Sequence, residues 1–125
     1  DRFTYDAATR TLFINFEHLS IRSRDDVDAV RAEIERHVRP LGRKVDAVVN
    51  YDHFVLDAEV QGDWAAMVHE LVERYYHRVV RYSTSSFLRA KLGPALAARG
   101  VAAQIYESAE QAQAGLRGAA KPGTA

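Results

Sequence analysis

The stretch "VDAVVNY", Val45 to Tyr51, decides how this chain folds. It is a short run rich in β-branched residues, which is typical of a strand covered on both faces. Before it, apolar residues recur every three or four positions until Pro40 and Gly42, which predicts a helix with one face in the core. These apolar residues are Val27, Val30, Ile34, Val38 and Leu41. Ser23 and Asp26 have the spacing of a capping box at the start of this helix.

A second helix is predicted after the strand. Its apolar residues occupy the i, i+3, i+4, i+7, i+8 and i+11 positions of one helical face. They are Trp64, Met67, Val68, Leu71, Val72 and Tyr75. We expect one ring of the Tyr75-Tyr76 pair to enter the core. The other ring would stay at the surface near Arg78 and Arg81, where it would suit a partner contact.

Further strands are predicted on both sides of this unit. Residues 2–6 and 11–21 predict an antiparallel hairpin joined by the turn "AATR". Residues 78–83 predict another strand, and residues 101–106 predict the last one. Strands that alternate with helices favour right-handed crossovers and a mostly parallel sheet. The fold class is therefore α/β, with the order β-β-α-β-α-β-α-β-α.

Two more helices complete the predicted order. Ser85 or Ser86 is expected to cap a helix that runs through Leu96, and Pro94 is expected to kink or split it because proline lacks a donor. Near the end of the chain, the capping-box pair Ser108 and Gln111 predicts the last helix. Residues 1–116 are expected to form one domain and residues 117–125 a disordered tail. Because the chain starts with a strand-like segment rather than Met, we interpret it as a fragment.

Composition excludes several classes of protein. The 125 residues are 47% hydrophobic and 27% charged, the balance of an ordinary globular domain. The charges cancel at 17 against 17, which removes the basic field that nucleic-acid binding needs. Cysteine is absent, so disulfides and thiolate metal sites are excluded. Without a long apolar run or a signal-like start, we expect a soluble, cytoplasmic domain with no membrane or nucleic-acid partner.

One candidate ligand site follows from the predicted sheet. The carboxyl ends of parallel strands share one rim, and two polar segments should meet there. The candidate rim residues are Asn50, Tyr51, Asp52, His53, Ser83, Thr84, Ser85, Ser86 and Arg89. Helix-start N–H groups, hydroxyls and a guanidinium could bind an anion. However, Ser is also a common helix cap, and we prefer the cap interpretation.

Two other clusters have simpler interpretations. Asp52 beside His53 could form an acid/base couple, but adjacent strand residues point to opposite faces and no nucleophile motif is nearby. His69, Glu73 and His77 share one side of the second helix, which suggests a metal site. Their spacing departs from the zinc-protease motif, and they lie off the apolar face, so we expect a solvated surface. No metal site is predicted.

The order of elements resembles the STAS-like fold of anti-sigma-factor antagonists, over nearly all of residues 2–116. Those antagonists carry a phosphorylatable Ser at the helix that follows the central strand. Here that junction reads "NYDHFVLDAEVQGDW", with no Ser or Thr from Asn50 to Trp64. The resemblance therefore does not extend to that phospho-switch.

Four segments carry a more specific resemblance. "TLFINFEHLSIRS", "LGRKVDAVVNYDHF", "RYSTSSFLRAKLG" and "IYESAEQA" are similar to the C-terminal domain of certain bacterial acyl-CoA:acetate/3-ketoacid CoA-transferase-like proteins. Such enzymes move CoA between an acyl-CoA and a carboxylic acid through a glutamyl thioester formed in their transferase domains. No segment here resembles that glutamate's motif. The nucleophile's role is therefore not assigned to any of Glu17, Glu33, Glu70 or Glu107.

The resemblance implies a non-catalytic accessory domain. It would have no cofactor of its own, and CoA or acyl-CoA would bind only through the parent enzyme. Its partner would be the CoA-transferase body, in the same chain or in a second subunit, and a homo-oligomer is possible. The alternative is a stand-alone module that binds a small ligand or anion at the rim.

Overall fold

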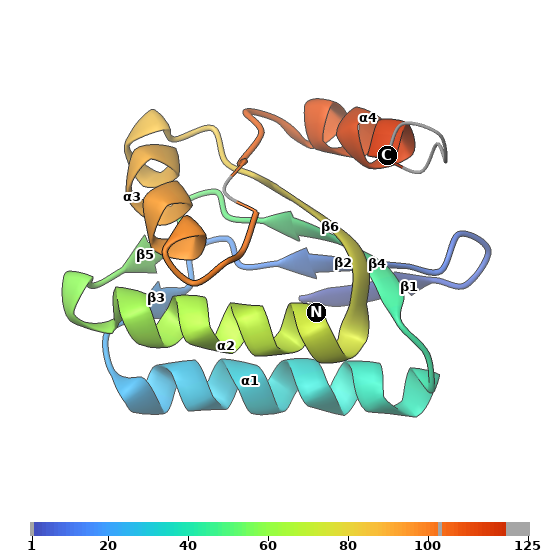
Figure 1. Cartoon of the computed structure of the whole chain (residues 1–125), viewed down its shortest axis with the longest axis horizontal. Coiled ribbons are helices and arrows are strands. Elements are labelled where there is room, and N and C mark those ends of the chain that lie inside the picture. The colour runs from blue at the N-terminus through green and yellow to red at the C-terminus, as the bar shows by residue number, and fades with distance from the viewer. Residues whose placement is uncertain (1, 103, 120–125) are drawn as a thin grey trace.

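The computed structural model describes residues 2–102 and 104–119, and it is a mixed α/β fold (Figure 1). The main sheet has the strand order β1-β2-β4-β6. These strands are β1 (Phe3–Asp6), β2 (Thr11–Asn15), β4 (Val45–Asn50) and β6 (Tyr76–Tyr82). The strand β1 pairs antiparallel with β2, whereas the other two pairings are parallel. The predicted α/β class with a mostly parallel sheet is confirmed.

Helices cover both faces of the sheet. The helices α1 (Arg24–Val38) and α2 (Gln61–Tyr75) lie side by side on one face, and α4 (Ala109–Ala119) lies on the other (Figure 1). The helix α3 (Ser86–Ala97) packs beside α2 at one end of the sheet. Two 3-10 turns, η1 (Arg39–Leu41) and η2 (Ala58–Val60), precede β4 and α2. The larger apolar core lies under α1, α2 and α3, and a smaller cluster around Val48, Val80 and Ala112 lies under α4.

The predicted helix starts agree with the local geometry. The Ser23 hydroxyl accepts a hydrogen bond from the N–H of Asp26, and the Asp26 carboxylate accepts one from the N–H of Ser23, so the capping box is complete. Before α4, Ser108 accepts a bond from the N–H of Gln111. The Gln111 side chain accepts its bond from Glu107 rather than from Ser108, so this second box is shifted by one residue.

The predicted last strand, residues 101–106, is wrong for the part of it that the structure describes. Only Tyr106 forms a bridge, parallel to Tyr82 at the edge of β6. Its N–H donates to Arg81 and its carbonyl accepts from Ser83. The segment thus touches the sheet edge at one point, because it leads from α3 across to α4 on the opposite face.

Two other local predictions need correction. The second hairpin strand ends at Asn15 instead of residue 21, because His18 adopts a left-handed backbone with φ of 62°. Ser20–Ile21 forms a separate strand, β3, which pairs with β5 (Val55–Leu56). Pro94 does not split α3. Pro94 and Ala90 are both on the exposed side, where water can reach the carbonyl that loses its donor.

The last helix extends into the predicted tail. The helix α4 continues to Ala119, so the first three residues of the predicted tail, 117–119, are helical. Residues 120–125 of that predicted tail lie outside the described part of the chain. Within the ranges 2–102 and 104–119, no helix is long and apolar enough to cross a bilayer.

Candidate functional site

The predicted rim forms where β2, β4 and β6 end together. Asn15 is in register with Asn50, and Asn50 is in register with Tyr82. The side-chain amide of Asn50 donates to the Asn15 side-chain oxygen at 3.3 Å. Each Asn oxygen also accepts the N–H two residues on, at 2.8 Å, from Glu17 and from Asp52. These two side chains therefore shape the loops after their own strands.

The carboxylate of Asp52 joins the two halves of the rim. Its Oδ1 accepts the backbone N–H of Thr84 at 2.5 Å, the Thr84 hydroxyl at 2.7 Å and the Ser83 hydroxyl at 3.5 Å. Partial burial raises the pKa of Asp52, but the Thr84 bonds, the nearby His53 and the Ser83 bond outweigh it, so the pKa is lowered. The structure brings the two predicted segments of the rim together, and the internal carboxylate takes the donors that an external anion would need.

Ser85 and Arg89 of the predicted rim are also engaged in internal hydrogen bonds. The Ser85 hydroxyl caps α3 through the N–H of Leu88 at 3.1 Å, and the Ser83 hydroxyl accepts the N–H of Ser85 at 3.1 Å. Nη1 of Arg89 donates to the carbonyl of Ser83 at 2.6 Å. Ser86 is exposed at the first residue of α3. The geometry favours the helix-cap interpretation over the anion cradle.

His53, the neighbour of Asp52, stacks on a second histidine. The His53 ring stacks on His18 from the loop after β2, with centroids 4.9 Å apart and planes 7° apart. Both histidines have a left-handed backbone, with φ of 54° and 62°. This stacked pair occupies the position where the sequence suggested an acid/base couple of Asp52 and His53.

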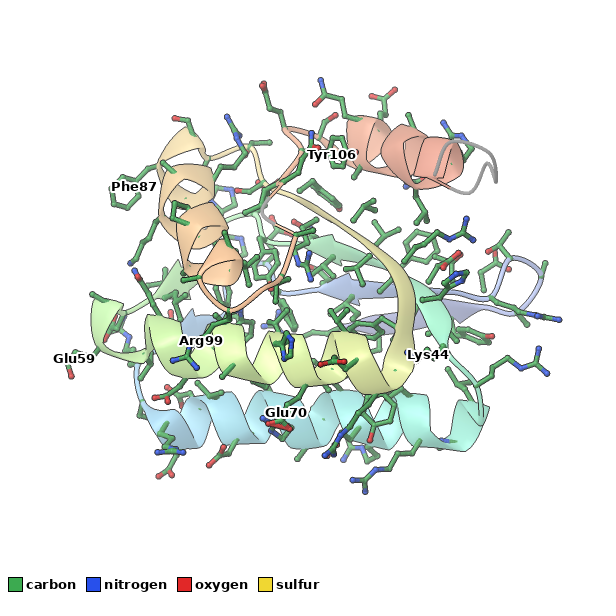
Figure 2. The ribbon with its side chains drawn as sticks, in the orientation of Figure 1. Lys44, Glu59, Glu70, Phe87, Arg99 and Tyr106 are labelled. Carbon is green, nitrogen blue, oxygen red and sulfur yellow. The ribbon has the colours of Figure 1, made fainter. Side chains whose placement is uncertain are left out.

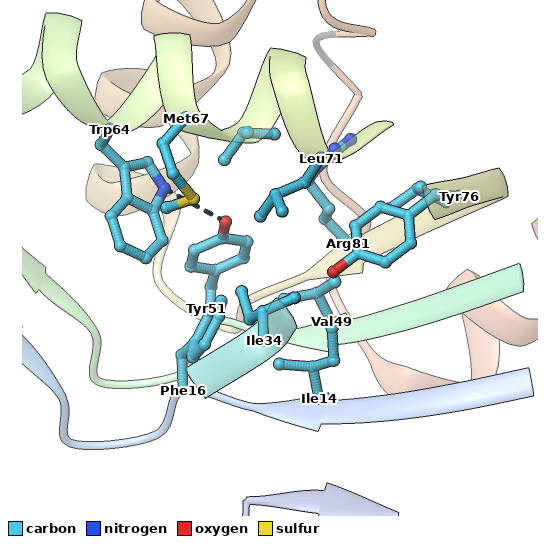
Figure 3. Close-up of a pocket in the computed structure, with 12 residues that line it drawn as sticks. Ile14, Phe16, Ile34, Val49, Tyr51, Trp64, Met67, Leu71, Tyr76 and Arg81 are labelled. Carbon is cyan, nitrogen blue, oxygen red and sulfur yellow. Dashed lines mark hydrogen bonds between the residues drawn. The ribbon is translucent and has the colours of Figure 1, made fainter. Parts of the chain in front are cut away.

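Tyr51, the last predicted rim residue, lies in the core. Its hydroxyl accepts a hydrogen bond from Nε1 of Trp64 at 3.3 Å (Figure 3). Burial raises the pKa of this phenol, and the nearby Arg81 and Trp64 partly offset the increase. Tyr51 therefore stabilises the interior instead of facing a ligand at the rim.

The other predicted cluster borders an open pocket of about 430 Å³. His69 and Glu73 lie 3.3 Å apart on α2, whereas His77 belongs to β6 and faces Asp46 at 3.8 Å. Across residues 2–102 and 104–119, no three His, Asp or Glu side chains are placed to hold a metal ion. The pocket also contains Arg81, which the sequence interpretation placed at the surface but which is only 3% exposed. The signal that could have found it is its period-two spacing from Val79, which faces the same helices.

The charge of Asp52 should stabilise the fold in a pH-dependent way. Because the folded-state pKa lies below the ordinary value of 3.8, the contribution is present above that pH and is lost as pH falls through the folded-state pKa. Asp52→Asn is expected to lower the free energy of unfolding by about 1–2 kcal/mol at pH 7. Urea titrations from pH 7 to pH 2 should show that difference shrinking in acid. Asp28→Asn, at an exposed site, is the control, and a gap independent of pH would contradict this role.

Comparison with known proteins leaves the family open. No protein-family model, no curated protein and no solved structure matches this chain.

Proposed function

We propose that this chain is a STAS-like accessory domain of a CoA-transferase-like enzyme, and that it binds the transferase body without taking part in the chemistry. The proposal rests on the four segments that resemble such domains. It includes a cytoplasmic location, which the absence of cysteine favours. The closed rim also supports a non-catalytic role, since Asp52 and Arg89 are both held by internal partners.

The observation that carries the proposal is the outer face of α3. Phe87 is 77% exposed and points away from the rest of the molecule (Figure 2). Ala90, Pro94 and Ala97 follow it at helical spacing and are exposed as well. A solvated helix face normally carries charged side chains, and an exposed apolar stripe is typical of a contact surface.

The two cations of α3 do not interrupt this stripe. Arg89 turns back to the carbonyl of Ser83, and the Lys91 ammonium donates to the carbonyl of Leu56 in β5. This second contact holds α3 against the strand that carries Val55, which is 44% exposed. The α3 face is the name used below for the exposed residues Phe87, Ala90, Pro94 and Ala97.

Hydrogen exchange of α3 tests the proposal. The backbone amides of α3 should exchange at least about ten-fold more slowly in the natural-length gene product than in residues 1–125 alone, because the transferase body covers them. Phe87→Glu should abolish this difference by placing a charge in the contact. It should not unfold α3, because an acidic residue in the first helical turn suits the helix dipole. Far-UV circular dichroism checks that the helix content is kept.

The matched control is Ala32→Glu, an exposed site on α1 that should leave the protection unchanged. Equal exchange of α3 in both proteins would overturn the proposal. If the protection of α3 in residues 1–125 alone rises with protein concentration, a second copy of the chain covers the α3 face. That result would also contradict the proposal. Deletion of residues 1–125 from the natural-length protein should lower the melting temperature of that protein or disrupt its assembly.

A further inference from the structure

Arg81 is a buried cation with no matching carboxylate. It lies in β6 and is 3% exposed, yet within residues 2–102 and 104–119 no carboxylate oxygen lies within 4.0 Å of it. Arg78, on the same strand, makes the contrast clear. Its guanidinium makes two bonds to Asp46, at 2.6 and 3.1 Å. A charge removed from water without a partner is costly, so the environment of Arg81 requires an explanation.

The interior side of Arg81 faces two phenols, and its guanidinium shares a side-chain hydrogen bond with one of them, Tyr51. Arg81, Tyr51 and Tyr76 line a small cavity of about 20 Å³ between the sheet and α2 (Figure 3). The Tyr76 hydroxyl is buried and has no hydrogen-bond partner in the described part of the chain. Burial lowers the pKa of Arg81, and the nearby phenols Tyr51 and Tyr76 partly offset the decrease. Among the residues that the structure describes, no carboxylate compensates Arg81 from inside the fold.

The outer side of Arg81 faces the pocket of about 430 Å³, a volume within the usual range of small-molecule sites. Val72, Val79 and Val101 supply apolar walls. His69 and His77 supply polar groups that can donate hydrogen bonds. The nearby Glu73 lies 3.3 Å from His69 and adds one negative charge, which disfavours a doubly charged ligand.

We propose that this pocket binds the carboxylate of a small monocarboxylic acid, with Arg81 as the residue that holds the carboxylate and the valine side chains in contact with its apolar body. A guanidinium matches a planar carboxylate through two parallel N–H···O bonds, which gives orientation as well as attraction. The site is separate from the α3 face and from the strand-end rim, so it does not depend on the proposed function.

Butyrate is the probe, and thermal unfolding of the whole chain is the first measurement. A ligand that binds only the folded state stabilises the protein, and above Kd this stabilisation grows with the logarithm of the ligand concentration. The melting temperature should therefore rise with butyrate and stay constant with sodium chloride at equal ionic strength. Chemical shifts in a titration should move for residues 79–81 and 100–102 and stay constant for the rim.

Arg81→Met removes the charge and keeps a similar length. It should weaken butyrate binding at least about ten-fold, while the protein without butyrate stays folded or becomes more stable, as buried charges replaced by apolar groups often do. Arg89→Met, whose guanidinium lies at the rim, should bind butyrate like the wild type. Absence of any butyrate response, or a stronger response to inorganic phosphate than to butyrate, would overturn the proposal. Unchanged binding by the Arg81 variant would also do so.

Discussion

Trp64→Ala is expected to lower the free energy of unfolding by about 3–5 kcal/mol. Trp64 is fully buried, and its ring packs against Phe16, Phe54 and Tyr51 with centroids 5.5, 5.0 and 6.4 Å away. Truncation leaves a cavity at the junction of α2 with the ends of β2 and β4. It also removes the Nε1 donor of the Tyr51 hydroxyl. The loss is a large part of the 5–15 kcal/mol that usually separates folded from unfolded domains.

Two variants separate the causes of this loss. Trp64→Phe keeps a ring in the core and removes only the donor and part of the volume, so its cost should be clearly smaller. Phe87→Ala removes an exposed ring and should change stability by less than about 0.5 kcal/mol. Because Trp64 is the only tryptophan, urea unfolding must be followed by far-UV circular dichroism instead of fluorescence. A cost for Trp64→Ala below about 1 kcal/mol would contradict the packing seen here.

The regular elements could be predicted because their signals are local. The face of α2 follows from the three-four spacing that begins at Trp64, and all of its core positions except the partly exposed Val72 and Tyr75 are buried. The central strand follows from its β-branched run and is buried from Val45 to Val49. One ring of the tyrosine pair does enter the core, since Tyr76 is 5% exposed. Tyr75 instead binds Glu35 and Arg39 at the outer side of α1.

The features that sequence analysis missed depend on contacts between distant segments. Arg81 is buried because α2 and residues 100–102 pack over β6, and its period-two spacing from Val79 indicates only the face of the strand, not the segments that cover it. The strand β5 exists because Val55 can pair with Leu19 and Ser20, far away in the chain. At the rim, too, one feature follows from local sequence signals and another depends on tertiary contacts. Parallel strands predict that Asp52 meets Thr84, but the bond that closes the rim is set by the loop conformations.

Gly115→Ala is expected to destabilise the protein by about 2–3 kcal/mol, as overpacking of a tight contact does. A methyl group at this position would overlap the hydroxyl and ring of Tyr106. That ring packs against the smaller apolar cluster around Val80 and Ala112, so turning it away would break these contacts. The helix α4 must then shift away from the sheet, which exposes the cluster around Val80 and Ala112.

Overpacking and helix propensity predict opposite changes in stability for Gly115→Ala. Alanine normally stabilises a helix by up to about 1 kcal/mol relative to glycine, so propensity alone predicts a gain. Gly118→Ala is the matched control on the same helix, because nothing lies within 4 Å of its added methyl group, and it should show a small gain. Thermal unfolding of both variants measures the difference. A gain in both would mean that α4 is not held against Tyr106, and the smaller core would then need no helix to cover it.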